Sequence, residues 1–180
     1  MDGAVWVAVL TGTTAVLASW VTSQGNRRAA TAQEELSARS QFVREQREAR
    51  KAAYLDFMRQ AGVTEELYFR LDDVLFPPGR IDQADVDAHV KRTRDALRDA
   101  FEPLKHGTRV VVLEGPAGVA ECAEAVLRAA FSGNRRLYDL ANGGHNPNEA
   151  RARFVGARDD YRMRVRDFAA AASASMDRHI

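Results

Sequence analysis

The sequence predicts an all-α protein with an N-terminal transmembrane helix, a long stalk helix and an antiparallel domain resembling a four-helix bundle. An uncharged apolar run occupies residues 4–21. Beyond it, apolar residues recur every three or four positions, which is the spacing of one helix face. Short connections rich in Pro, Gly and Asn join these segments, so consecutive helices should be antiparallel. We expect an anchor at 1–23, a polar stalk at 24–51 continuous with the next helix, and a bundle at 52–180.

The apolar run, AVWVAVLTGTTAVLASWV, is long enough to cross a membrane as a helix. At ~1.5 Å per residue it spans about 27 Å, against ~30 Å for a hydrocarbon core. Trp6 and Trp20 lie near its two ends, where indole rings favour the membrane interface. No base precedes the run, whereas Arg27 and Arg28 follow it. Basic flanks stay inside, so we expect a single-pass plasma-membrane protein with a cytoplasmic C-terminal domain.

Two other interpretations of this run remain open. A cleaved signal peptide would leave a secreted helical protein, but its n-region would be Met1-Asp2-Gly3, which carries an acid and no base. A buried helix of a soluble domain is the other interpretation. The single cysteine, Cys122, allows no disulfide within one chain, which is consistent with a cytoplasmic domain.

Small residues in the predicted span indicate a homodimer as one further hypothesis. Ala4, Ala8 and Gly12 lie four apart, a spacing that lets membrane helices approach closely. Small residues are also common in such spans without any association. In the stalk, Leu36 and Val43 lie seven apart and form one weak coiled-coil seam, which is shorter than a stable coiled coil needs.

We expect one long helix over residues 26–76. Its second half has a regular apolar face, which continues in phase across Gly62. The face comprises Tyr54, Phe57, Ala61, Tyr68, Leu71 and Leu75. A break at Gly62 with Thr64 capping a new helix is the alternative, and the prolines at 77–78 end the segment in either case.

The second helix is expected to begin at the N-cap Asp82 and to end at Gly107, which suits a left-handed C′ position. Its inner face comprises Val86, Val90, Thr93, Leu97, Phe101 and Leu104. Val110 to Leu113 is a strongly β-favouring run, and residues 108–114 are expected to form a connector, either extended or helical. A phosphate loop is excluded here, because no lysine follows the glycines.

Two more helices complete the predicted bundle. The third opens at Gly115-Pro116 and is interrupted near 132–134; its inner face comprises Val119, Ala123, Val126, Ala130, Leu137 and Leu140. The fourth runs from Pro147 to about 178, with Asn146 and Glu149 as a capping box. Its inner face comprises Phe154, Ala157, Tyr161, Val165, Phe168, Ala172 and Ser175.

The fourth helix also carries the most basic patch of the chain. Arg151, Arg158, Arg162 and Arg166 are candidates for a face that contacts an acidic protein partner or lipid. A solvated helix surface is the alternative interpretation. The net charge of the whole chain is only +1, with 26 bases against 25 acids, which argues against a nucleic-acid binder.

No motif for catalysis, metal binding or a cofactor is found in the sequence. The four histidines are far apart, and HExxH, CxxC and Glu-x-x-His are all missing. Cys122 has no histidine near it in sequence and is expected to be a small core residue. We therefore expect no cofactor and lean away from an enzyme.

Three segments carry a resemblance to known proteins: GNRRAA after the apolar run, REQREARKAAYLDFM, and VVLEGPAGVAECAEAV. With them the chain resembles small single-pass, membrane-anchored helical-bundle proteins of high-GC Gram-positive bacteria, a class of unknown function. The resemblance implies a helical bundle on a membrane tether. It supplies no catalytic residues.

These observations favour a non-enzymatic interaction or scaffolding protein at the cytoplasmic face of the plasma membrane. Its partners would be the lipid bilayer, a protein of unidentified type and, in one hypothesis, a second copy of the chain. Two alternatives remain: a sensor whose bundle core binds a small apolar ligand, and a secreted protein after signal cleavage.

Overall fold

The computed structural model describes residues 3–75, 82–142 and 147–177, and leaves out the side chains at 3–32, 34–35, 72–74, 83 and 147. Within these ranges the chain is all-α, as predicted, and contains no strand. Four helices follow one another along the chain: α1 (Gly3–Leu75), α2 (Gln83–Glu114), α3 (Ala117–Ala141) and α4 (Pro147–Asp177). The chain divides into two compact units, Met1–Gln46 and Arg47–Ile180.

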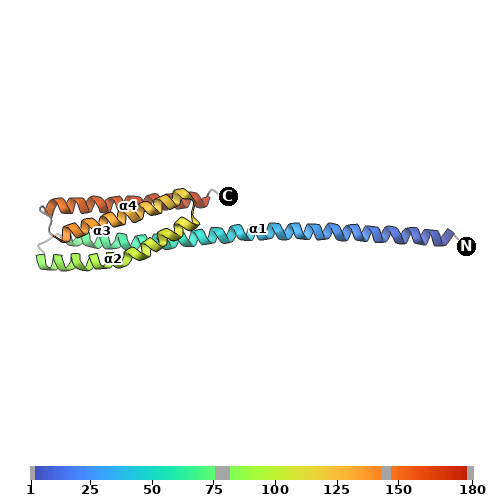
Figure 1. Ribbon diagram of the computed structural model, residues 1–180, viewed down its shortest axis with the longest axis horizontal. Helices are drawn as coiled ribbons and strands as arrows, with labels where there is room; N and C mark the ends of the chain where they lie inside the picture. Colours follow the sequence, from blue (N-terminus) through green and yellow to red (C-terminus); the bar gives the residue numbers. More distant parts are fainter. Residues whose placement is uncertain (1–2, 76–81, 143–146, 178–180) are drawn as a thin grey trace. The chain divides into compact units, whose positions relative to one another are not determined.

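The second unit is a helical bundle of the C-terminal part of α1 with α2, α3 and α4 (Figure 1). Consecutive helices run in opposite directions, and ring contacts between α1 and α4 show the same arrangement. The Phe57 and Phe168 ring centroids are 4.4 Å apart, and those of Tyr68 and Phe154 are 5.8 Å apart. As the α1 residue number rises, its partner on α4 falls, so these two helices are antiparallel.

Aromatic side chains at seven-residue spacing form the centre of this core. Tyr68 on α1 and Tyr161 on α4 are both fully buried, and their rings meet edge to face at 5.4 Å. Aromatic pairs in this geometry contribute about 0.5–1.5 kcal/mol beyond their buried area. The buried residues confirm the predicted inner faces of all four helices, with Phe101, Leu140 and Ala157 only partly buried.

The N-terminus of α2 confirms the predicted cap. The Asp82 carboxylate accepts a hydrogen bond from the Ala84 amide at 3.3 Å. The predicted end of this helix at Gly107 is wrong, because α2 continues through residues 108–114 and ends at Gly115, whose amide donates to the Val111 carbonyl at 2.8 Å. Gly107 instead lies buried inside the helix, next to Phe57 of α1.

The predicted interruption of α3 at 132–134 is also wrong, since the helix is continuous from Ala117 to Ala141. Gly133 lies buried beneath the ring of Tyr68. Pro116 is the N-cap of α3, one position before the first turn. The helix α4 begins at Pro147, as predicted, whereas its expected cap Asn146 lies outside the described residues.

The helix α1 is unbroken at Gly62, so the single long helix is confirmed and the break at that residue is wrong. Among the described residues, no helix is long and apolar enough to cross a membrane. The side chains of the expected span and its flanks lie outside the described residues. They include the proposed interface residues Trp6, Trp20, Arg27 and Arg28 and the proposed association residues Ala4, Ala8 and Gly12.

Candidate functional site

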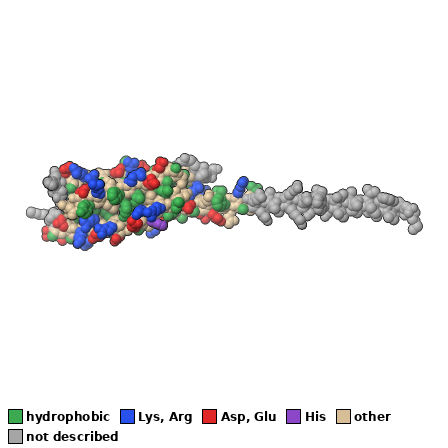
Figure 2. All heavy atoms as spheres, viewed as in Figure 1, with side chains coloured by type: hydrophobic (Ala, Val, Ile, Leu, Met, Phe, Trp, Pro, Cys, Tyr) green, Lys and Arg blue, Asp and Glu red, His purple; other side chains and the backbone are tan. Residues whose placement is uncertain are grey.

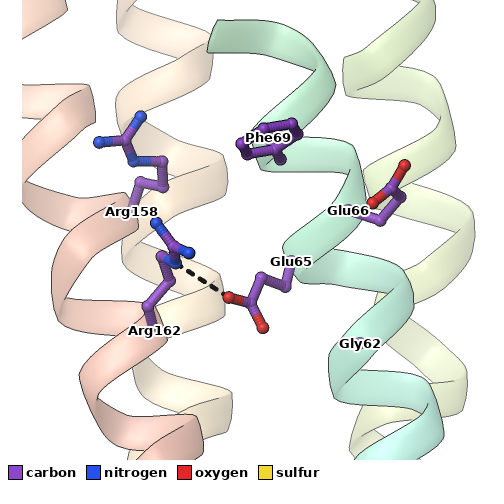
Figure 3. A pocket seen from close by; sticks show the side chains of 6 residues that line it. All are labelled: Gly62, Glu65, Glu66, Phe69, Arg158 and Arg162. Carbon is purple, nitrogen blue, oxygen red and sulfur yellow. Dashed lines mark hydrogen bonds and ion pairs between the residues drawn. The ribbon is translucent and has the colours of Figure 1, made fainter.

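The four arginines of the expected partner face lie in different surroundings. Arg158 and Arg162 line a groove between α1 and α4 (Figure 3). Arg151 is partly buried one turn after the start of α4, and Arg166 is exposed one turn beyond Arg162. The structure therefore brings two of the four together at a concave site.

The α1–α4 groove has a volume of about 330 Å³. Its walls comprise Gly62, Glu65, Glu66, Phe69, Arg158 and Arg162. Figure 3 shows Glu65 and Arg162 pointing toward one another, and the Arg162 Nε to Glu65 Oε1 distance is 2.9 Å. The exposed ring of Phe69 lies one helical turn beyond Glu65.

The charges in this groove largely compensate one another. Arg162 is paired with Glu65 across the two helices, and Arg158 donates to the Asp159 carboxylate at 2.8 and 3.1 Å. Only 14% of the Arg158 side chain is exposed. Because both guanidinium groups already have carboxylate partners, the groove is better suited to a mixed polar and apolar protein surface than to a free anion.

Two further arginines of α4, Arg153 and Arg164, are paired along the helix itself. Arg153 bonds Glu149 one turn earlier, and Arg164 lies 3.3 Å from Asp160 and 3.8 Å from Asp167. Figure 2 shows the same mixture on one face of the bundle, where basic, acidic and hydrophobic side chains are interspersed. Such exposed pairs contribute little stability, about 0–1 kcal/mol each.

A second groove, between α2 and α3, was not foreseen from the sequence. Its volume is about 380 Å³. Its walls comprise Arg94, Leu97, Arg98, Phe101 and Glu102 on α2 and Phe131, Asn134, Leu137 and Tyr138 on α3. The signal that could have revealed it is the pair Phe131 and Tyr138, which lie seven apart on α3 but off its inner face.

Two contacts shape this second groove. The Phe101 and Phe131 ring centroids lie 6.4 Å apart, and the Arg94 guanidinium lies 5.9 Å from the centre of the Tyr138 ring. The Nε atom of Arg94 is buried and has no hydrogen-bond partner among the described residues. Asn134 connects the groove to the core, since its Oδ1 lies 2.9 Å from the Tyr68 hydroxyl.

Among the described residues, the buried tyrosines Tyr68 and Tyr161 have the most strongly raised pKa values. Burial raises the pKa of Tyr68 far above its usual value, and the neighbouring Tyr161 adds to this increase. Burial likewise raises the pKa of Tyr161, whose hydroxyl donates to the Ala61 carbonyl at 2.9 Å. Both hydroxyls are therefore structural donors that remain protonated in the folded chain.

The potential metal ligands are scattered. His89 is partly buried and His106 exposed, both on α2, whereas His145 and His179 lie outside the described residues. Cys122 is a free, partly buried thiol packed against the core. Within residues 3–75, 82–142 and 147–177, no three His, Cys, Asp or Glu side chains come together as a metal site would require.

Comparison with known proteins found no match: no family model, no curated protein and no solved structure matches the chain.

Proposed function

We propose that this chain is a single-pass plasma-membrane protein whose bundle acts in the cytoplasm as a non-enzymatic interaction or scaffolding module. Support for the anchor comes from the sequence of residues 4–21, which is uncharged and has tryptophans near both ends. Support for the orientation comes from Arg27 and Arg28, because basic residues beside a span remain on the cytoplasmic side.

The observation that carries the proposal is the continuity of α1. The helix runs from Gly3 to Leu75 without a break, so the apolar run and the first bundle helix are parts of one continuous α-helix. A helix that spans a bilayer satisfies its own backbone hydrogen bonds, which is what the hydrocarbon region requires. A protein of this design would hold its bundle at the membrane without a separate linker.

Exposed apolar side chains on α1 support a role in protein interaction. Leu36, Phe42 and Val43 are 67%, 59% and 59% exposed. Leu36 and Val43 lie seven residues apart on one face of the helix, and Phe42 lies about 100° around the helix axis from Val43. Exposed apolar side chains along one stretch of helix are available for contact with another protein. A protein partner or the same segment of a second copy would cover them.

Truncation tests the anchor. The full chain should sediment with membranes and resist carbonate extraction, whereas a chain that starts at Gln24 should be soluble with unchanged helicity per residue. The double variant Leu10→Arg/Leu17→Arg keeps the chain length and should also leave the membrane, because each central arginine costs about 2.5–3.5 kcal/mol of insertion. Retention of the truncated chain on membranes would contradict the proposal. A mature N-terminus near residue 24 would instead favour the secreted alternative.

Cysteine labelling tests the orientation. In a Cys122→Ala background, Ser40→Cys places the only thiol on the exposed stalk, since Ser40 is exposed on α1. A membrane-impermeant maleimide should label this thiol only after the cells are opened. Labelling of intact cells would show that the domain faces outward.

Crosslinking in native membranes, followed by mass spectrometry, tests the interaction. We expect reproducible crosslinks from Lys51 at the end of the stalk to a partner protein or a second copy. The triple variant Leu36→Gln/Phe42→Gln/Val43→Gln should reduce these crosslinks, with the exposed pair Glu45→Gln/Glu48→Gln as a matched control on the same helix. No reproducible crosslink, or equal crosslinking in both variants, would contradict the proposed contact surface.

A further inference from the structure

The α2–α3 groove differs from the α1–α4 groove because the Nε of Arg94, a partly buried residue in its wall, has no acceptor among the described residues. Among the described residues, Arg94 Nε is the only buried side-chain nitrogen or oxygen that has no hydrogen-bond partner. Leaving a buried donor unsatisfied is unfavourable, and more so when the group is charged.

The Arg94 guanidinium is held at the wall of the groove by its neighbours. It lies over the Tyr138 ring at 5.9 Å, an arrangement that favours a cation and restricts its orientation. Leu97 and Leu137, which are almost fully buried, also line the groove. A cation against apolar side chains is poorly screened, so its attraction for an anion is stronger than at an open surface.

An apolar surface adjoins this arginine. Phe131 is 62% exposed although it packs against Phe101, so much of its ring remains open to a ligand. Arg98 and Asn134 add further hydrogen-bond donors to the walls. The groove therefore offers one partly buried cation beside an aromatic pair, within a volume typical of the smaller small-molecule sites.

We propose that the α2–α3 groove binds a small carboxylate with an aromatic or branched apolar body. The carboxylate accepts hydrogen bonds from the two terminal nitrogens of the Arg94 guanidinium, which match its two oxygens. The apolar body packs on Phe101 and Phe131. A carboxylate fits better than a phosphate, because Glu102 also lines the groove and its negative charge opposes a dianion more strongly.

This site is independent of the membrane anchor, because all of its residues lie on α2 and α3. The groove is also linked to the core of the bundle through a hydrogen bond. Asn134 lines the groove and its amide oxygen lies within hydrogen-bond distance of the Tyr68 hydroxyl. A ligand at the groove would therefore contact a residue that is bonded to the centre of the bundle.

Equilibrium dialysis of the full chain in lipid nanodiscs tests the proposal, with 4-phenylbutyrate as the probe and empty nanodiscs as the blank. We expect saturable binding in excess of the blank. The neutral analogue 4-phenylbutanamide should bind at least about tenfold more weakly, because it lacks the charge that strengthens a hydrogen bond to arginine. This comparison uses the unaltered protein, so it does not depend on how any variant folds.

Substitutions in the groove test whether 4-phenylbutyrate binds there. Arg94→Gln should weaken it at least about tenfold, and Arg94→Lys should weaken it too, because an ammonium cannot replace the planar fork. Phe131→Ala removes an exposed ring and should weaken binding with little effect on unfolding. Arg128→Gln, on the exposed part of the same helix, should leave it unchanged. No saturable binding, equal binding of the amide, or binding that survives Arg94→Gln would overturn the proposal.

Discussion

The Tyr68 hydroxyl lies directly over Gly133, where a larger residue would collide with it. A Cβ atom built on Gly133 would lie 2.8 Å from Tyr68 Cζ and closer still to the hydroxyl oxygen. The same hydroxyl lies 3.0 Å from the Ala130 carbonyl and 2.9 Å from the Asn134 amide oxygen. Because Gly133 has no side chain, the buried phenol of Tyr68 fits against α3 and links α1 to α3 through hydrogen bonds.

Gly133→Ala should destabilise the bundle by about 1–3 kcal/mol, the usual cost of forcing extra volume into a packed core. The clash outweighs the gain in helix propensity of about 1 kcal/mol. Gly156→Ala on α4 is the matched control, because an added Cβ there meets nothing within 4 Å and should stabilise the helix. Denaturant unfolding followed by circular dichroism measures both variants. A stabilised Gly133→Ala chain would show that Tyr68 moves aside without cost.

Gly107 should behave in the opposite way to Gly133. Its added Cβ would lie 3.5 Å from Phe57 Cα and 3.5 Å from Phe57 Cδ2, which is ordinary contact. Gly107→Ala should therefore raise the free energy of unfolding by about 0.5–1 kcal/mol through lower chain entropy in the unfolded state. Gly107→Val should lower it, because the two branched methyl groups reach the Phe57 ring. Equal effects of the two substitutions would contradict this geometry.

These two glycines show where prediction from sequence failed. Glycine often marks the end or an interruption of a helix, so the sequence predicts a helix end at Gly107 and an interruption at 132–134. In the structure each lies inside a helix and admits an aromatic ring from α1. The ring comes from a residue 50 or more positions away in the sequence, so local patterns carry no information about it.

The core residues could be predicted because the regular spacing of apolar residues along one helix is visible in a short stretch of sequence. Tyr54, Tyr68 and Leu75 follow one heptad row of α1, and all three are buried. The unbroken phase across Gly62 correctly predicted a continuous helix. The α2–α3 groove was not predictable, because the unpaired Nε of Arg94 depends on how two separate helices pack.

The stability of the bundle should fall as the pH rises above 10. A tyrosine in the unfolded chain loses its proton near the ordinary pKa of 10.0, whereas burial raises the pKa of Tyr68 and of Tyr161 well above that value. Above pH 10 the unfolded chain therefore binds fewer protons than the folded chain, and unfolding becomes more favourable by about 1.4 kcal/mol per pH unit for each tyrosine. Denaturant midpoints between pH 8 and 11.5 measure this slope.

The variants Tyr68→Phe and Tyr161→Phe should each make the free energy of unfolding fall less steeply above pH 10, because one buried tyrosine no longer contributes to the slope. Each should also cost about 0.5–1.5 kcal/mol at neutral pH, because a buried hydrogen bond disappears. Tyr138→Phe, at an exposed position on α3, is the control and should leave the buried pair's contribution intact. An unchanged alkaline slope in both core variants would mean that other groups cause the loss.

The Arg162–Glu65 ion pair should contribute only modestly to stability, although it joins two helices far apart in sequence. The two side chains are 41% and 35% exposed, so water and salt screen their attraction. A double-mutant cycle with Arg162→Gln and Glu65→Gln should give a coupling energy of about 0.2–1 kcal/mol. The coupling should decrease between low and high salt. A larger, salt-independent coupling would show that the pair is effectively buried, and the α1–α4 groove would then be closed to a partner.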